Sequence, residues 1–177
     1  MKPALICAAI LVAATAGAAH ADEYARAVSV PVYSLQQAQG IAVEYEQLHL
    51  LPERWSVAGG LGIRDSADAD FASTSLSASA EVRYWFKNGV AMRGWFVGAG
   101  LGLTWTSLTD RIDDRSIGSN LAVAETLQLG YRMVPWRQLE ITPSLGIELV
   151  SDVDLTGRLP VWTHGSLTTG LTVGWLF

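Results

Sequence analysis

The chain has 177 residues, half of them apolar, and a formal net charge of −5 at pH 7. This length suits a single domain. The acidic balance disfavours a nucleic-acid partner, because a polyanion would be repelled. The apolar fraction is high, yet no apolar run approaches the length of a membrane-spanning helix, which needs about 20 residues. A membrane protein of this composition must therefore alternate its apolar residues with small or polar ones.

The N-terminus has the order of a secretory signal peptide. A lysine near the start precedes an apolar run over residues 4–14, and small residues then close on Ala19-His20-Ala21. This arrangement predicts cleavage after position 21, and therefore a signal peptide over residues 1–21 and a mature domain over residues 22–177. The chain's only cysteine, Cys7, would be removed. The mature protein would then have no disulfide and no cysteine ligand, and we expect neither a cofactor nor a metal centre.

Hydrophobic residues alternate with small or polar ones along the rest of the chain. In residues 164–177 the odd positions from 167 onward are mainly Leu, Val, Trp and Phe, whereas most even positions are Ser, Thr or Gly. A period of two indicates strands with one face toward lipid and the other toward a lumen. The pattern predicts eight strands, over residues 26–34, 40–48, 55–64, 75–86, 93–108, 120–133, 137–151 and 164–177.

These strands predict an all-β fold, an eight-stranded antiparallel transmembrane up-and-down β-barrel with short periplasmic turns and moderate extracellular loops. The short turns are expected at residues 51–54, 87–89 and 134–136. The longer loops are expected at residues 35–39, 65–74, 109–119 and 152–163. Aromatic residues should form a belt at the periplasmic interface, and eight lie beside the predicted turns or C-terminus: Trp55, Trp85, Phe86, Trp95, Tyr131, Trp136, Trp175 and Phe177.

In this architecture, residues 26–177 resemble the small eight-stranded outer-membrane barrels of the OmpA-domain and OmpX/Ail type. The resemblance implies export to the outer membrane of a Gram-negative envelope, with outer-membrane lipids and lipopolysaccharide as partners. The alternating end of the chain resembles the terminal signal read by the outer-membrane assembly machinery. Its residues are Thr169, Leu171, Val173, Trp175 and Phe177.

The inward parity of the predicted strands collects a polar network. Eight strands enclose a lumen only wide enough for side chains, so these groups should pair with one another or trap water. We therefore predict a plugged, salt-bridged interior, with a narrow cation-preferring channel as the alternative. Carboxylates outnumber arginines, so at least one is expected to be protonated, hydrated or paired elsewhere. The network comprises Glu44, Glu46, Arg64, Glu81, Arg83, Gln128, Arg132, Glu140 and Glu148.

One pair of residues suggests an enzyme. His164-Gly165-Ser166 resembles the His-x-Ser pair that a family of outer-membrane lipid A deacylases uses on an eight-stranded barrel, where the pair faces lipid and an acidic residue completes a triad. Here the strand parity directs His164 and Ser166 inward, and Leu167 stands where that family has asparagine. We favour a non-enzymatic barrel of structural or surface-interaction type over a lipid A-modifying enzyme.

The predicted extracellular loops are acidic. Oxygen ligands at this density can hold Ca²⁺ or bridge it to lipopolysaccharide phosphates. None of the spacings matches an EF-hand, which favours solvated acidic loops, with a divalent cation as the alternative partner. The residues are Asp65, Asp68, Asp70, Asp110, Asp113, Asp114, Asp152 and Asp154.

Glu125 breaks the alternation. Leu127, Leu129 and Tyr131 set the lipid-facing parity of their strand, and Glu125 falls on the same face within the apolar band. A β-bulge near Glu125 would switch the parity and turn the carboxylate inward. Otherwise Glu125 faces lipid and marks a contact with another protomer or a lipid headgroup. We favour the bulge, because a carboxylate in the band is unfavourable.

Overall fold

The computed structural model describes residues 25–31, 39–48, 54–67, 70–86, 92–112, 115–154 and 163–177, and the predicted signal peptide lies outside them. The described residues form strands throughout their length, joined by turns. The strands are β1 (Arg26–Pro31), β2 (Gln39–Leu48), β3 (Trp55–Ala67), β4 (Phe71–Trp85), β5 (Gly94–Asp110), β6 (Arg115–Trp136), β7 (Leu139–Asp154) and β8 (Thr163–Leu176). None of the described residues belongs to a helix long and apolar enough to cross a membrane.

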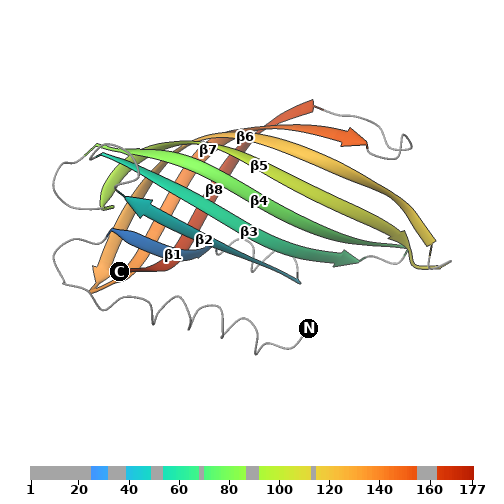
Figure 1. Cartoon of the computed structure of the whole chain (residues 1–177), viewed down its shortest axis with the longest axis horizontal. Coiled ribbons are helices and arrows are strands. Elements are labelled where there is room, and N and C mark those ends of the chain that lie inside the picture. Colours follow the sequence, from blue (N-terminus) through green and yellow to red (C-terminus); the bar gives the residue numbers. More distant parts are fainter. Residues whose placement is uncertain are drawn as a thin grey trace.

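The eight strands form one closed barrel in which each strand pairs with its neighbours in chain order. All pairings are antiparallel, and β1 closes the barrel against β8, with Ala27 opposite Leu176 and Pro31 opposite Thr172. Figure 1 shows the short β1 and β2 beside the C-terminus, while β3 to β7 extend farther toward the opposite end. We call these the termini end and the loop end. The predicted fold class is confirmed.

The strands are longer at the loop end than the sequence predicted. β3 and β4 stay paired out to Ala67 and Ala72, and β5 and β6 stay paired out to Asp110 and Arg115. The loops predicted over residues 65–74 and 109–119 are therefore wrong in extent. Their Ser- and Thr-rich flanks lack apolar alternation, but the backbone ladder continues because each β-hairpin satisfies its own hydrogen bonds.

The turn between β6 and β7 also differs from the prediction. β6 runs through Trp136, and the turn consists of the two residues that follow it, not of residues 134–136. The register of β6 against β7 shifts between Met133 and Trp136. Pro135 lacks the N–H needed for a ladder bond, which explains a bulge at this place. Arg137 makes the tight turn with a positive φ of 43°.

Aromatic side chains surround the outer wall near the termini end. Trp55 packs edge-on against Tyr84 with ring centroids 5.1 Å apart, and Trp95 packs in the same way against Tyr131 at 5.0 Å. Tyr84 also accepts a hydrogen bond from Arg54 at 3.0 Å. This arrangement matches an interfacial belt. The prediction was wrong for Trp85, whose side chain is 3% exposed and lies inside the barrel.

Glu125 faces outward, and the predicted bulge is absent. The register of β6 runs without a break past this residue, which pairs with Leu101 on β5 and Leu149 on β7. Both leucines are outward and more than half exposed, and Glu125 itself is exposed. β6 pairs without a break with β5 and β7 at this level, so the strand has no extra residue that would turn the carboxylate inward.

We expect spin labels at positions 123, 124 and 125 to report this parity directly. Accessibility to lipid-soluble oxygen should be high at 123 and 125 and low at 124, because successive side chains on a strand point to opposite faces. The measurement is continuous-wave EPR power saturation in lipid bilayers. A maximum at position 124 would contradict the register described above.

Candidate functional site in the barrel interior

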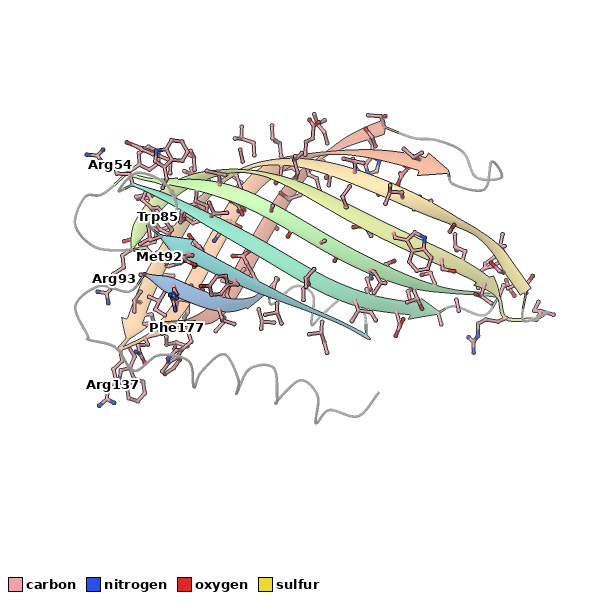
Figure 2. All side chains as sticks on the ribbon, in the orientation of Figure 1. Arg54, Trp85, Met92, Arg93, Arg137 and Phe177 are labelled. Carbon is pink, nitrogen blue, oxygen red and sulfur yellow. The ribbon has the colours of Figure 1, made fainter. Side chains whose placement is uncertain are left out.

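A layer of hydrophobic side chains closes the lumen at the termini end. Its members are fully or almost fully buried and come from β1, β2, β4, β5 and β8 and from the turn before β5. Trp85 and Phe96 stack at its centre with ring centroids 4.9 Å apart. Phe96 occupies the space above Gly130, where any Cβ would overlap its ring. The layer comprises Ala27, Leu48, Trp85, Met92, Phe96 and Leu176, and Figure 2 shows Trp85 and Met92 near this end, where Phe177 also lies.

An ion cluster centred on Glu46 lies against this layer. One oxygen of Glu46 accepts hydrogen bonds from both Arg83 Nη1 and Arg132 Nη2, each at 2.5 Å. The other oxygen accepts from the Ser56 hydroxyl, which in turn accepts from Trp85 Nε1 at 2.9 Å. Glu46 is 1% exposed. A buried carboxylate is stable only when its oxygens are satisfied in this way.

Arg83 joins two further carboxylates to the cluster. Its Nη2 atom lies 2.8 Å from Glu44 Oε1 and 2.8 Å from Glu81 Oε2. The second oxygen of Glu81 accepts a hydrogen bond of 2.6 Å from Gln128 Nε2. Glu81 fits here because Gly98, diagonally across the β4–β5 ladder, has no side chain, and a Cβ there would overlap the carboxylate. The small inward residues of β5 thus make room for charged groups from β4.

Arg132 completes the cluster on the other side of Glu46. Its Nε atom lies 2.8 Å from Glu140 Oε2 and donates to Thr142 Oγ1 at 3.3 Å. Both guanidinium groups also lie over aromatic rings of the hydrophobic layer: Arg132 is 5.0 Å from the Trp85 ring centre and Arg83 is 5.1 Å from that of Phe96. Cation–π attraction of this kind is strongest where water is excluded.

The cluster is electrostatically unbalanced. It contains four carboxylates, Glu44, Glu46, Glu81 and Glu140, against the two guanidinium groups. Within the described residues, Glu140 Oε1 has no hydrogen-bond partner although the residue is completely buried. The lumen therefore carries an excess of negative potential or of bound protons.

Above the ion cluster, toward the loop end, the lumen opens into a cavity of about 730 Å³. Glu44, Glu81 and Arg83 contribute to its lining. Most of the wall consists of small residues, because Gly, Ala, Ser and Thr occupy most inward positions of β3 to β6 and β8 at this level. The hydrophobic layer and the ion cluster together thus form a plug, and the cavity lies on the loop-end side of it.

The structure brings together most of the predicted network but leaves two members outside the cluster. Arg64 is exposed near the loop end of β3. Glu148 lines the cavity but has no hydrogen bond or ion pair within the described residues. The cluster itself contains seven of the predicted residues: Glu44, Glu46, Glu81, Arg83, Gln128, Arg132 and Glu140.

Sequence reasoning missed the groups that complete the plug. Ser56 links Glu46 to Trp85, and Phe96 lies beneath Arg83. The inward parity that selected Arg83 also applies to Trp85, two positions later on the same strand. Parity thus predicts Trp85 on the inner face, and its assignment to the interfacial belt, which rested on proximity to a predicted turn, was inconsistent with that parity.

His164 and Ser166 lie on exposed, inward-parity positions near the loop end of β8. Their partners across the ladder are Val150 and Glu148 on β7. Among the described residues, neither side chain forms a hydrogen bond with the other or with an acid. On the neighbouring strand β7, Ser151 faces lipid and contacts Thr163 at 3.5 Å. Leu149 stands two residues before Ser151, at the position where a His-x-Ser pair has histidine.

The acidic residues at the loop end are spread over several strands. Asp65 accepts a hydrogen bond from Thr74 at 2.8 Å, and Asp152 accepts one from Asn120 at 3.2 Å. The side chains of Asp68, Asp113, Asp114 and Asp154 lie outside the described residues. Within the part of the chain that the structure describes, no three acidic or histidine residues come together as a metal site. A divalent cation at these loops stays a prediction.

Comparison with known proteins identifies the family. The model of the family described as lipid A 3-O-deacylase (PagL) matches residues 39–156, the segment from β2 to just beyond β7. The chain belongs to the PagL family. The comparison with curated proteins found no relative.

Two solved structures resemble this PagL-family chain. A major outer membrane protein from Thermus thermophilus is 14% identical over 86% of this chain and 100% of its own, with a TM-score of 0.44. The translocator domain of the autotransporter NalP from Neisseria meningitidis is 15% identical over 96% of this chain and 68% of its own, with a TM-score of 0.41. At these identities the resemblance concerns the fold alone.

The matched PagL segment consists of the barrel wall and contains a single histidine, His49. His49 comes directly after β2 in the sequence and lies outside the described residues. His164 lies beyond the matched segment. The family match and the described geometry therefore agree on the barrel, while the described lipid-facing wall holds no histidine next to a serine.

We expect the ion cluster to be essential for the stability of the barrel. Replacing Arg132 with Met should lower the free energy of unfolding by about 3–5 kcal/mol, because Glu46 and Glu140 would lose a buried countercharge. Urea titration in detergent micelles, followed by tryptophan fluorescence, measures this loss. Arg64→Met removes an exposed arginine instead and should change stability by only about 0.5 kcal/mol or less. Equal effects of the two substitutions would show that the cluster contributes no special stability.

Proposed function

We propose that this PagL-family protein is a non-conducting, non-hydrolytic barrel of the outer membrane that acts at the cell surface. The observation that carries the proposal is the plug. Phe96, Leu176, Glu46 and Glu140 are each no more than 1% exposed, which supports a lumen that is closed to water at their level. Ions crossing the barrel would have to displace a desolvated ion cluster, and breaking such a cluster is strongly unfavourable.

The extended strands support a role on the outer side. β6 has 22 residues and β5 has 17, whereas a tilted strand needs about 9–11 residues to cross the membrane. With the aromatic belt at the termini end, the surplus would lie at the loop end, where the outward residues Thr74, Ser107 and Ser119 follow the apolar band. The protein would therefore project a stiff, paired β-wall beyond the lipid headgroups, into the lipopolysaccharide layer.

Purified protein inserted into planar bilayers should give no reproducible single-channel steps, because the plug spans the lumen. A conducting porin inserted under the same conditions serves as the control. Glu140→Gln should be equally silent. Steps in the native protein that Glu140→Gln abolishes would contradict the proposal and favour a narrow cation-preferring channel through the acidic lumen.

A second candidate is removal of the 3-O-linked acyl chain from lipid A. The match to the lipid A 3-O-deacylase family favours it. The described wall does not assemble a serine, a histidine and an acid on its lipid face, which is the arrangement that such acyl transfer chemistry needs. Ser151 and Glu125 face lipid on adjacent strands, but no described histidine lies between them.

Lipid A mass spectra from cells with and without the gene separate these two candidates. We expect identical profiles, because the described residues provide no activated nucleophile. Loss of one hydroxyacyl chain in the presence of the gene would establish the deacylase instead. Ser151→Ala and Ser166→Ala would then show whether the nucleophile lies on the lipid face or in the lumen.

A further inference from the structure

The cavity above the plug has the dimensions of a ligand site. Its volume of about 730 Å³ falls within the roughly 300–1,000 Å³ typical of small-molecule pockets. By volume it would hold roughly two dozen water molecules, at about 30 Å³ each. A closed barrel needs no such space, because larger side chains at the same inward positions would fill it.

The wall of the cavity combines polar and apolar groups, and most of its side chains are small. Hydroxyl groups from the five strands β4 to β8 line it, interspersed with glycines that expose the backbone. Such a wall can exchange hydrogen bonds with a hydroxylated ligand, while its alanines and Phe96 supply apolar contacts. Representative lining residues are Gly60, Ser77, Ser79, Gly102, Thr104 and Thr126.

The charge of the cavity favours a cation. Glu148 lines it without a hydrogen bond or ion pair among the described residues, and its neighbours across the two ladders, Thr126 and Ser166, are neutral. At the floor, Glu44 and Glu81 share the single guanidinium of Arg83 with Glu46. A recess with low-dielectric walls concentrates this negative potential and attracts positive ligands.

The floor also contains an unsatisfied donor. Arg83 lines the cavity and is 4% exposed, and its Nε–H has no acceptor within the described residues. Buried donors of this kind normally find a partner.

From these observations we propose that the cavity binds a hydroxylated organic amine about the size of an amino sugar, entering from the loop end. The ammonium group pairs with Glu148, and the hydroxyl groups bond to the Ser and Thr side chains of the wall and to the floor around Arg83. A bare metal ion fits less well, because no three acidic or histidine groups converge among the described residues. The proposal goes beyond a closed surface barrel, which requires no ligand.

Isothermal titration of the refolded full-length barrel in detergent micelles tests the proposal with glucosamine as the probe. Glucose, which has the same ring without the positive charge, and glucuronate, which is negative, are the matched comparisons. We expect saturable binding of glucosamine, weaker binding of glucose and none of glucuronate. Absence of saturable glucosamine binding at millimolar concentration, or equal affinity for glucose, would overturn the proposal.

Variants locate the binding. Glu148→Gln should weaken glucosamine binding about tenfold, the loss expected for one charge-assisted hydrogen bond, and should leave glucose binding unchanged. Glu125→Gln removes a carboxylate from the outer face of the sheet and should have no effect. An unchanged affinity in Glu148→Gln would contradict the assigned ammonium site.

A second pair of variants tests the cavity itself. A Cβ at Gly102 would meet its neighbours at ordinary contact distances of 3.5–4.0 Å, so Gly102→Phe can place a ring in the cavity without distorting the wall. It should abolish glucosamine binding. Ala99→Phe adds the same ring on the lipid-facing side and should bind normally. Heat-modifiable migration confirms that each variant is folded, and normal binding by folded Gly102→Phe would overturn the proposal.

Discussion

The interior of the barrel depends on the shared use of one carboxylate by two arginines. Glu46 accepts from both Arg83 and Arg132, and these two residues connect it to carboxylates on β2, β4 and β7. An arginine or a glutamate alone in this dry lumen would be prohibitively unfavourable. The mutual contacts therefore tie β2, β4, β6 and β7 together across the lumen and oppose any change in their relative register.

This cluster also divides the lumen into two functional halves. Below it, Trp85 and Phe96 form a hydrophobic layer against which both guanidinium groups pack. Above it, the glycines and small hydroxyl residues of β3 to β5 leave a polar cavity. The same small residues that make room for Glu81 at Gly98 leave empty space farther along the strand, where no large side chain faces them. A closed floor and an open chamber thus follow from one sequence pattern.

The match to the PagL family is stronger evidence for the structure of the barrel wall than for a particular catalytic activity. The family match covers β2 to β7, and the strands there have the expected lipid-facing alternation. Catalysis on such a wall needs a specific group of side chains, and a fold can persist when that group changes. Here Leu149 stands two residues before the lipid-facing Ser151, and Glu125 faces lipid between Leu101 and Leu149.

The sequence by itself determined the strand number, the closed antiparallel order and the inward or outward parity of nearly every residue, because a period of two is a local property of an extended chain. Parity cannot specify height along the barrel. Glu46 and Arg132 are separated by 86 positions, and only the stagger of the closed sheet places them at one level while leaving Arg64 and Glu148 away from the cluster. The course of β6 past Glu125 was likewise decided by pairing on both sides, since hydrogen bonds to two neighbouring strands outweigh the preference of one carboxylate for the lumen.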